Sequence, residues 1–234
     1  MDYSPRTIAL LTELLHPPTA PDPRPIQKLH NAMFEGGEPD YSSFAVTPMG
    51  PILANPGSQP GSVSQATFLG DRIQFREEHS PLTVEAFASR VMRLAGSVAK
   101  ARELGVFAGQ QVTVRSLVNP RHHKDARAFL RHGLLRFGDE LDVFGSNPQL
   151  YGLRFTFPGD ASPAGDAGAV MFALRVESYS ADPRSLFLEA QATFGPVDTG
   201  GDLTLLADRI GQVYEFLSRR ALSFIERFDQ PQGA

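Results

Sequence analysis

The chain has 234 residues, of which 41% are hydrophobic and 21% charged, and its formal net charge is −4. This length and composition predict a globular protein with a sizeable core, in one large domain or two closely packed lobes, and the slight acidity gives no electrostatic reason to expect nucleic acid or an anionic membrane as a partner. Because the sequence holds no cysteine, disulfides, thiolate nucleophiles and zinc–sulfur sites are excluded.

The N-terminal part of the chain is predicted to be a helical arm, residues 1–37, on a main α+β domain, residues 38–234. We expect a short helix over 7–16 and a second over 26–34, joined by a proline-rich connector. The arm lacks the basic start and apolar core of a signal peptide, and we expect a cytoplasmic protein without a membrane span. The arm should pack on the main domain or a neighbouring subunit through Leu11, Leu14, Leu15, Ile26, Leu29 and Phe34.

The next segment is predicted to contain strands followed by a long helix. Residues 44–47 and 52–54 favour weak strands, and residues 63–69 and 72–78 favour a hairpin because apolar and polar residues alternate in the latter. The helix is expected over residues 83–104. Its apolar residues recur every three or four positions, which is typical of a helix laid on an apolar surface: Val84, Phe87, Val91, Leu94, Val98 and Ala101.

The same order of strands and long helix then recurs. A strand over 111–118 and a short helix over 124–137 lead to three strands, expected over 151–157, 170–179 and 185–194. The second long helix is expected over residues 202–228, with an apolar seam of Leu203, Leu206, Ile210, Val213, Leu217, Ala221, Phe224 and Phe228.

These elements predict an α+β fold in which an antiparallel sheet carries both long helices on one face. Residues 38–140 and 141–234 would be two similar sheet-plus-helix halves, related either by duplication or by convergent packing. The sequence leaves that alternative open.

Three stretches of the chain carry a resemblance to a known family. They are the hairpin over 68–78, the strand VTVRSLVNP over 112–120, and the strand, acidic turn and helix over 186–228. Over roughly residues 60–230 the chain resembles a sporadically distributed family of uncharacterised bacterial proteins of similar length. The resemblance implies bacterial origin and an α+β fold, and it supplies no catalytic residues.

Four arginines fall on the polar side of four predicted strands: Arg76, Arg115, Arg154 and Arg175. If the strands share a sheet, these guanidinium groups share a face and would bind a carboxylate or phosphate. The alternative, which the sequence favours, is cross-strand ion pairing with Glu177 and Glu189 on a solvated face. Any specific polar site is expected here, around Arg115, Arg154 and Arg175.

A second polar cluster contains His122, His123 and Asp125. Histidines can bind a metal or transfer protons, but adjacent residues of a strand or loop point to opposite sides, and Asp125 is better placed to cap a helix. Glu77 and Glu78 likewise should point to opposite faces of their strand and so cannot form a catalytic pair. We therefore expect no metal site, with His122 and His123 as the alternative ligands.

The sequence favours a non-enzymatic interaction or oligomeric protein, because it contains no catalytic motif that we recognise. We expect it to pair with itself as a homodimer or with another protein, without a cofactor. The first alternative is a module that binds a small anionic ligand. The second is a metal-dependent hydrolase built on His122, His123 and Asp125.

Overall fold

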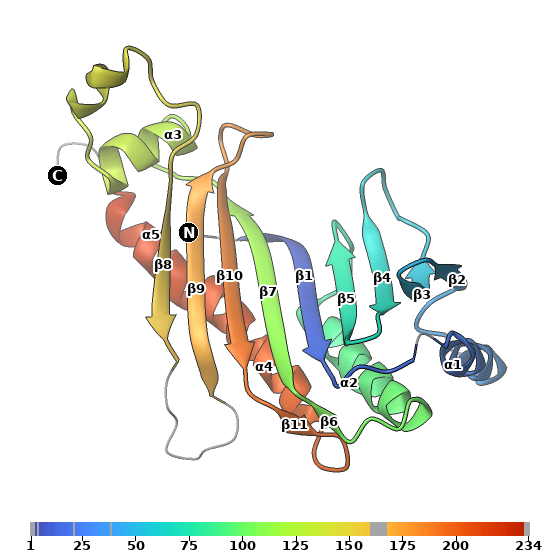
Figure 1. Cartoon of the computed structure of the whole chain (residues 1–234). Coiled ribbons are helices and arrows are strands. Elements are labelled where there is room, and N and C mark those ends of the chain that lie inside the picture. The colour runs from blue at the N-terminus through green and yellow to red at the C-terminus, as the bar shows by residue number, and fades with distance from the viewer. Residues whose placement is uncertain (1–2, 4, 21, 38, 160–167, 232–234) are drawn as a thin grey trace.

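The computed structural model describes residues 3, 5–20, 22–37, 39–159 and 168–231. Its main element is a nine-stranded antiparallel sheet with the strand order β2-β3-β4-β5-β1-β7-β10-β9-β8 (Figure 1). In chain order the strands are β1 (Arg6–Leu15), β2 (Ser43–Thr47), β3 (Gly50–Asn55), β4 (Val63–Phe68), β5 (Arg72–Glu78), β7 (Gly109–Val118), β8 (Gly152–Pro158), β9 (Ala169–Ser178) and β10 (Leu186–Phe194). Two short strands, β6 (Val106–Phe107) and β11 (Val197–Asp198), pair separately.

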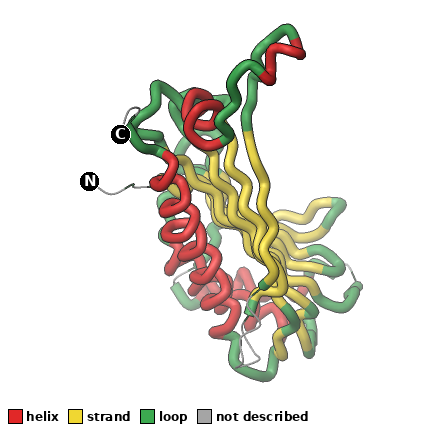
Figure 2. The backbone as a smooth tube through the Cα atoms, turned by 90° about the vertical axis from the view of Figure 1, so that its left-hand side faces the viewer, coloured by secondary structure: helices red, strands yellow, loops and turns green. Residues whose placement is uncertain are grey.

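Both long helices lie on the same face of this sheet (Figure 2). They are α2 (Val84–Ala101) and a C-terminal helix formed by α4 (Thr204–Glu215), a π-helical turn (Phe216–Ala221) and α5 (Leu222–Phe228). They lie side by side: a Cβ at Gly96 of α2 would come 3.1 Å from Leu203 just before α4. The predicted α+β class is confirmed, including the antiparallel sheet under two long helices.

The short helix predicted over residues 7–16 is wrong, because this segment is strand β1. β1 lies in the middle of the sheet, between β5 and β7, so residues 6–15 are part of the sheet and not an arm on its surface. Leu10, Thr12 and Leu14 are buried beneath the helices, with the period of two expected of a strand. The segment RTIALLTELL carries apolar residues on both of its sides, as central strands do. Its pattern therefore fits the period of a helix as well as that of a strand.

The second N-terminal helix is α1 (Arg24–Glu35), which agrees with the prediction for residues 26–34. Its Ile26 is fully buried, whereas Phe34 at its end is exposed. Of the six apolar side chains expected to anchor the N-terminal part, Leu14 and Ile26 therefore belong to the core, and Leu15 and Phe34 do not.

The C-terminal helix keeps the predicted seam only up to the π-helical turn. Leu206, Ile210, Val213 and Leu217 are all 0% exposed, as the spacing predicts. A π-helical turn accommodates one extra residue and so rotates the positions that follow it. Beyond the turn the buried residues are Leu222, Ile225 and Asp229, whereas the predicted Phe224 and Phe228 are only partly buried. The buried positions beyond the turn are therefore shifted by one residue from the predicted seam.

The short helix predicted over residues 124–137 is more irregular than expected. It comprises α3 (Ala126–Ala128) and a π-helical segment (Phe129–Leu134), followed by a 3₁₀ helix (Glu140–Phe144). This last element projects beyond one end of the sheet in both views (Figures 1 and 2). Among the described residues no helix combines the length and the apolar character that crossing a bilayer would require.

Candidate functional site

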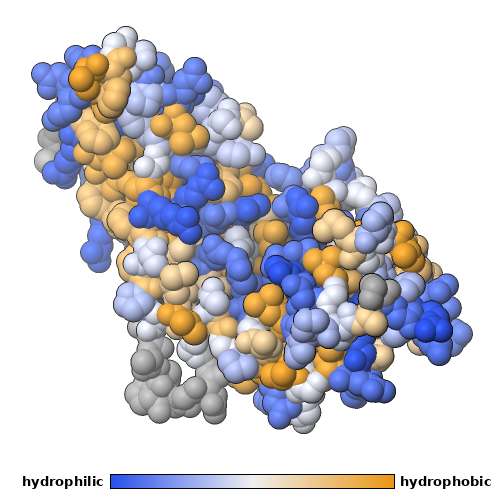
Figure 3. All heavy atoms as spheres, in the orientation of Figure 1, coloured by the Kyte–Doolittle hydropathy of each residue, from blue (hydrophilic) through white to orange (hydrophobic). Residues whose placement is uncertain are grey.

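The structure brings the four predicted arginines onto the open face of the sheet, opposite the helices. Arg115, Arg175 and Arg154 share one cross-strand row with Glu189, because these residues are direct neighbours on β7, β10, β9 and β8. Arg76 lies in the adjacent row on β5. Hydrophilic side chains gather across the middle of this face (Figure 3).

Three of these arginines form ion pairs; the pair of Arg115 with Glu189 crosses strands, as the sequence favoured, whereas Arg175 and Arg76 pair with a glutamate two positions along their own strand. Nε of Arg115 lies 2.7 Å from Oε2 of Glu189, and Nη2 of Arg175 lies 2.6 Å from Oε1 of Glu177. Arg76 pairs with Glu78 at 2.7 Å. Arg154 lies directly opposite Arg175, so like charges face each other there, and no ion pair of Arg154 occurs among the described residues. Anion binding on this face stays a prediction.

The two histidines of the second cluster separate, as expected of adjacent residues. His122 is exposed and contributes its backbone N–H, whereas the His123 ring lies 2.9 Å from the carboxylate of Asp229 and is buried. Asp125 caps α3, accepting a hydrogen bond from the N–H of Ala128 at 2.8 Å. In the described ranges, no group of three histidine or acidic side chains is arranged to hold a metal.

Asp229 joins three parts of the chain. Its fully buried carboxylate accepts hydrogen bonds from the Tyr3 hydroxyl, from the N–H groups of Arg121 and His122, and from His123. The Arg121 guanidinium also lies over the Tyr3 ring, 4.1 Å from its centroid. Burial raises the pKa of Asp229, but the hydrogen bonds from Arg121, Tyr3, His123 and His122 outweigh burial and hold the pKa below its usual range.

Replacing Asp229 with asparagine should lower the free energy of unfolding at neutral pH by about 1–3 kcal/mol, because buried donors lose their charged acceptor. The folded-state pKa lies below the unfolded value of about 3.9, so this stabilisation is present above that value and disappears as the pH falls through the folded pKa. Urea unfolding from neutral to acid pH should therefore show the difference between wild type and variant shrinking. Asp208→Asn, at an exposed position of α4, is the control; a difference that does not change with pH would contradict the role of Asp229.

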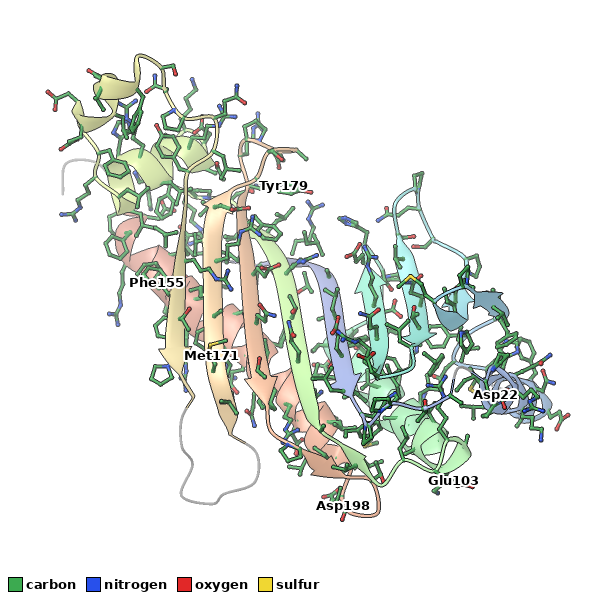
Figure 4. All side chains as sticks on the ribbon, viewed as in Figure 1. Asp22, Glu103, Phe155, Met171, Tyr179 and Asp198 are labelled. Carbon is green, nitrogen blue, oxygen red and sulfur yellow. The ribbon has the colours of Figure 1, made fainter. Side chains whose placement is uncertain are left out.

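The sequence did not predict a further site, an aromatic groove between the edge strand β8 and the C-terminal helix. This hollow of about 510 Å³ is lined by Phe155, Phe157, Pro158, Phe172, Leu174, Phe216, Arg220, Ala221 and Phe224. Phe155, labelled in Figure 4, extends from β8 toward the helix, and its ring meets the edge of Phe224 at 5.6 Å between centroids. Phe216 stacks on Phe172 at 4.8 Å. Phe157 remains 39% exposed, so the groove is not filled by the described part of the chain.

The rim of the groove is basic. Arg220 lines it, and an adjoining hollow is lined by Arg219, Arg220, Ser223, Phe224 and Arg227. Arg219 pairs with the exposed Glu215 one turn away, at 2.9 Å. For Arg220 and Arg227, the described residues provide no ion pair. The groove therefore combines aromatic walls with cationic side chains that are accessible to an anion.

The π-helical turn explains why this groove exists. Phe216, Arg220 and Ala221 belong to the turn, and Phe224 follows it. In the predicted phase Phe224 and Phe228 would lie in the core; the rotation turns Phe224 toward Phe155 at the sheet edge instead. π-helical turns are frequent at functional sites. Neither the turn nor the strand order follows from apolar spacing, which is why the sequence did not predict the groove.

A second hollow, of about 280 Å³, lies near the start of α2 and includes a buried ion pair. Glu77 faces the helices and is 2% exposed, while Glu78 lies on the open face, as predicted. Oε1 of Glu77 lies 2.6 Å from Nη1 of Arg90 and accepts a hydrogen bond from Ser64 at 2.8 Å. Arg90 also lies 3.6 Å from Asp40 and over the buried ring of Tyr41. The geometry supports a structural role for this pair in joining β5 to α2.

Neither a protein family model nor a curated protein matches the chain. The resemblance to a sporadically distributed bacterial family therefore stays a prediction.

Proposed function

We propose that this protein is a non-enzymatic interaction module, and that its aromatic groove receives an apolar group that carries acidic charge. The observation that carries the proposal is the 510 Å³ hollow with five phenylalanines in its walls and Arg220 at its rim. Binding sites of about 300–1,000 Å³ are commonly apolar with a few polar groups that orient the ligand. Exposed aromatic rings beside arginine are also the residues enriched at protein interfaces.

The two kinds of side chain would contribute differently. The phenylalanine rings offer apolar surface whose burial stabilises a complex, and edge-to-face contacts favour an aromatic occupant. Arg220 and Arg227 keep their charge at any working pH and offer planar donor groups for a carboxylate. A partner segment that combines an apolar side chain with a neighbouring Asp or Glu fits both features.

The test uses anilinonaphthalene sulfonate, a fluorescent probe that combines aromatic rings with one negative charge. We expect the wild-type protein to enhance its fluorescence saturably. Arg220→Glu replaces attraction by repulsion and should weaken binding about tenfold. Phe157→Asp, which places a carboxylate in the groove, should abolish it.

The matched control is Arg154→Glu, which makes the same charge change on β8 but on the opposite face of the sheet. It should bind the probe as wild type does. If Arg154→Glu or Arg175→Glu loses binding while Arg220→Glu retains it, the anion site lies on the open sheet face, where Arg154 faces Arg175, and the groove proposal fails.

A further inference from the structure

The element that projects beyond the sheet ends in an apolar tip. We define the tip as residues 139–144, which include the 3₁₀ helix Glu140–Phe144. Val143 is 81% exposed and Phe144 is 71% exposed. Both ribbon views show this element away from the body of the molecule, and hydrophobic atoms lie at its outer end (Figures 1, 2 and 3). Two large apolar side chains held this far into solvent indicate a contact with another molecule.

Three carboxylates precede these apolar side chains in the sequence of the tip. Asp139, Glu140 and Asp142 are all exposed, and within the described part of the chain none of them forms an ion pair. Gly145 has φ 65° and closes the 3₁₀ helix, with its N–H donating to the carbonyl of Asp142 at 2.9 Å. The tip is thus a short turn with a defined backbone that presents one aromatic ring, one valine and three negative charges.

The tip and the aromatic groove are complementary in apolar surface and in charge. The groove offers five phenylalanines, and its basic rim offers Arg219, Arg220 and Arg227. Within one chain the two features are separated: the tip precedes the start of β8, whereas the groove is lined by the second half of that strand, from Phe155 to Pro158. Figure 1 shows the tip at the opposite end of β8 from Pro158. A contact between them therefore requires a second molecule.

We propose that the tip of one copy of this chain enters the aromatic groove of a second copy, with Phe144 against the rings of Phe157 and Phe216 and the tip carboxylates against Arg220. The proposal rests on the proposed function and specifies its partner. A closed pair, in which each tip occupies the other copy's groove, satisfies both surfaces at once and has the two-fold symmetry most common among oligomers. Asp142 and Arg220 would form the charged pair nearest the aromatic contact.

Self-association can be tested by sedimentation velocity on the full chain over a range of concentrations. Wild type should dimerise, and Phe144→Asp should weaken dimerisation at least about 30-fold, because a central aromatic contact is lost. Phe144 is exposed, so the variant should fold as wild type does. Arg220→Glu should weaken dimerisation as well. Met49→Asp, at another exposed apolar residue far from both features in the sequence, should have no effect.

Mixing the two defective variants gives the decisive measurement. The Phe144→Asp chain keeps an intact groove and the Arg220→Glu chain keeps an intact tip, so an equimolar mixture should form a heterodimer through one remaining tip–groove contact. Each variant alone should stay monomeric at the same concentration. If both variants are monomeric and the mixture is too, or if Phe144→Asp dimerises as wild type does, the tip does not occupy the groove.

The probe separates this inference from the proposed function. Because the tip would compete for the groove, the monomeric Phe144→Asp variant should bind anilinonaphthalene sulfonate at least as well as wild type. A wild-type protein that is monomeric at every concentration but binds the probe through Phe157 and Arg220 would overturn the self-association and leave the groove as an interaction site. A wild-type protein that neither dimerises nor binds the probe would overturn both the self-association and the proposed function.

Discussion

Replacing Arg90 with leucine should lower the free energy of unfolding by about 3–5 kcal/mol, because it leaves the carboxylate of Glu77 buried without its charged partner. Glu77 is 2% exposed and lies 2.6 Å from Arg90. The substitution also removes the guanidinium group from the face of the Tyr41 ring, 4.9 Å from its centroid. Urea unfolding followed by circular dichroism measures the loss.

Arg93→Leu provides the matched control. Arg93 is on the same helix and pairs with Asp40, but its side chain is 56% exposed, so this change should cost about 1 kcal/mol or less. A double variant, Glu77→Leu with Arg90→Leu, should recover much of the stability that the single variant loses, since no buried charge remains. Equal losses for Arg90→Leu and Arg93→Leu would mean that the Glu77 pair is solvated.

Leu217→Ala should lower the free energy of unfolding by about 2–5 kcal/mol, because it leaves a cavity where the C-terminal helix packs on the sheet. Leu217 is 0% exposed and lies within the π-helical turn that carries Phe216 and Arg220. Loss of packing at this position should therefore also loosen the wall of the groove. The midpoint of urea unfolding measures the first effect, and fluorescence of the bound probe measures the second.

The control for this prediction is Glu215→Ala on the outer side of the same helix. Its side chain is 60% exposed, and its ion pair with Arg219 is exposed too, so the free energy of unfolding should change by about 0.5 kcal/mol or less. An unchanged midpoint for Leu217→Ala would show that the apolar seam does not form the core.

Apolar spacing was sufficient to predict most of the fold. Strand β5 follows from its alternation and helix α2 from its spacing of three or four residues, since the opposite face of each is clearly polar. The helix predicted for β1 is wrong because the apolar residues of this segment fit a helix and a central strand equally well. Its correct reading depends on β5 and β7, which lie far along the chain and whose pairing no local pattern reveals.

The two candidate sites differ in how far local patterns in the sequence could predict them. The polar parity of Arg115, Arg154 and Arg175 correctly indicated a shared face, because parity is a local property of each strand. The groove could not be found this way. It requires β8 to be the edge of the sheet, and it requires the π-helical turn to rotate Phe224 away from the core.

The position of β1 also sets an order of events during synthesis. β1 is synthesised before both of its neighbours in the sheet, since its Ala9 pairs with Glu78 on one side and Arg115 on the other. At a synthesis rate of about 5–20 residues per second, the second partner follows on the order of ten seconds after β1. Until β5 has been made, the apolar segment RTIALLTELL has unpaired backbone on both edges, and until β7 has been made one edge stays unpaired. This segment of the nascent chain should therefore stay prone to aggregation until residue 118 has emerged.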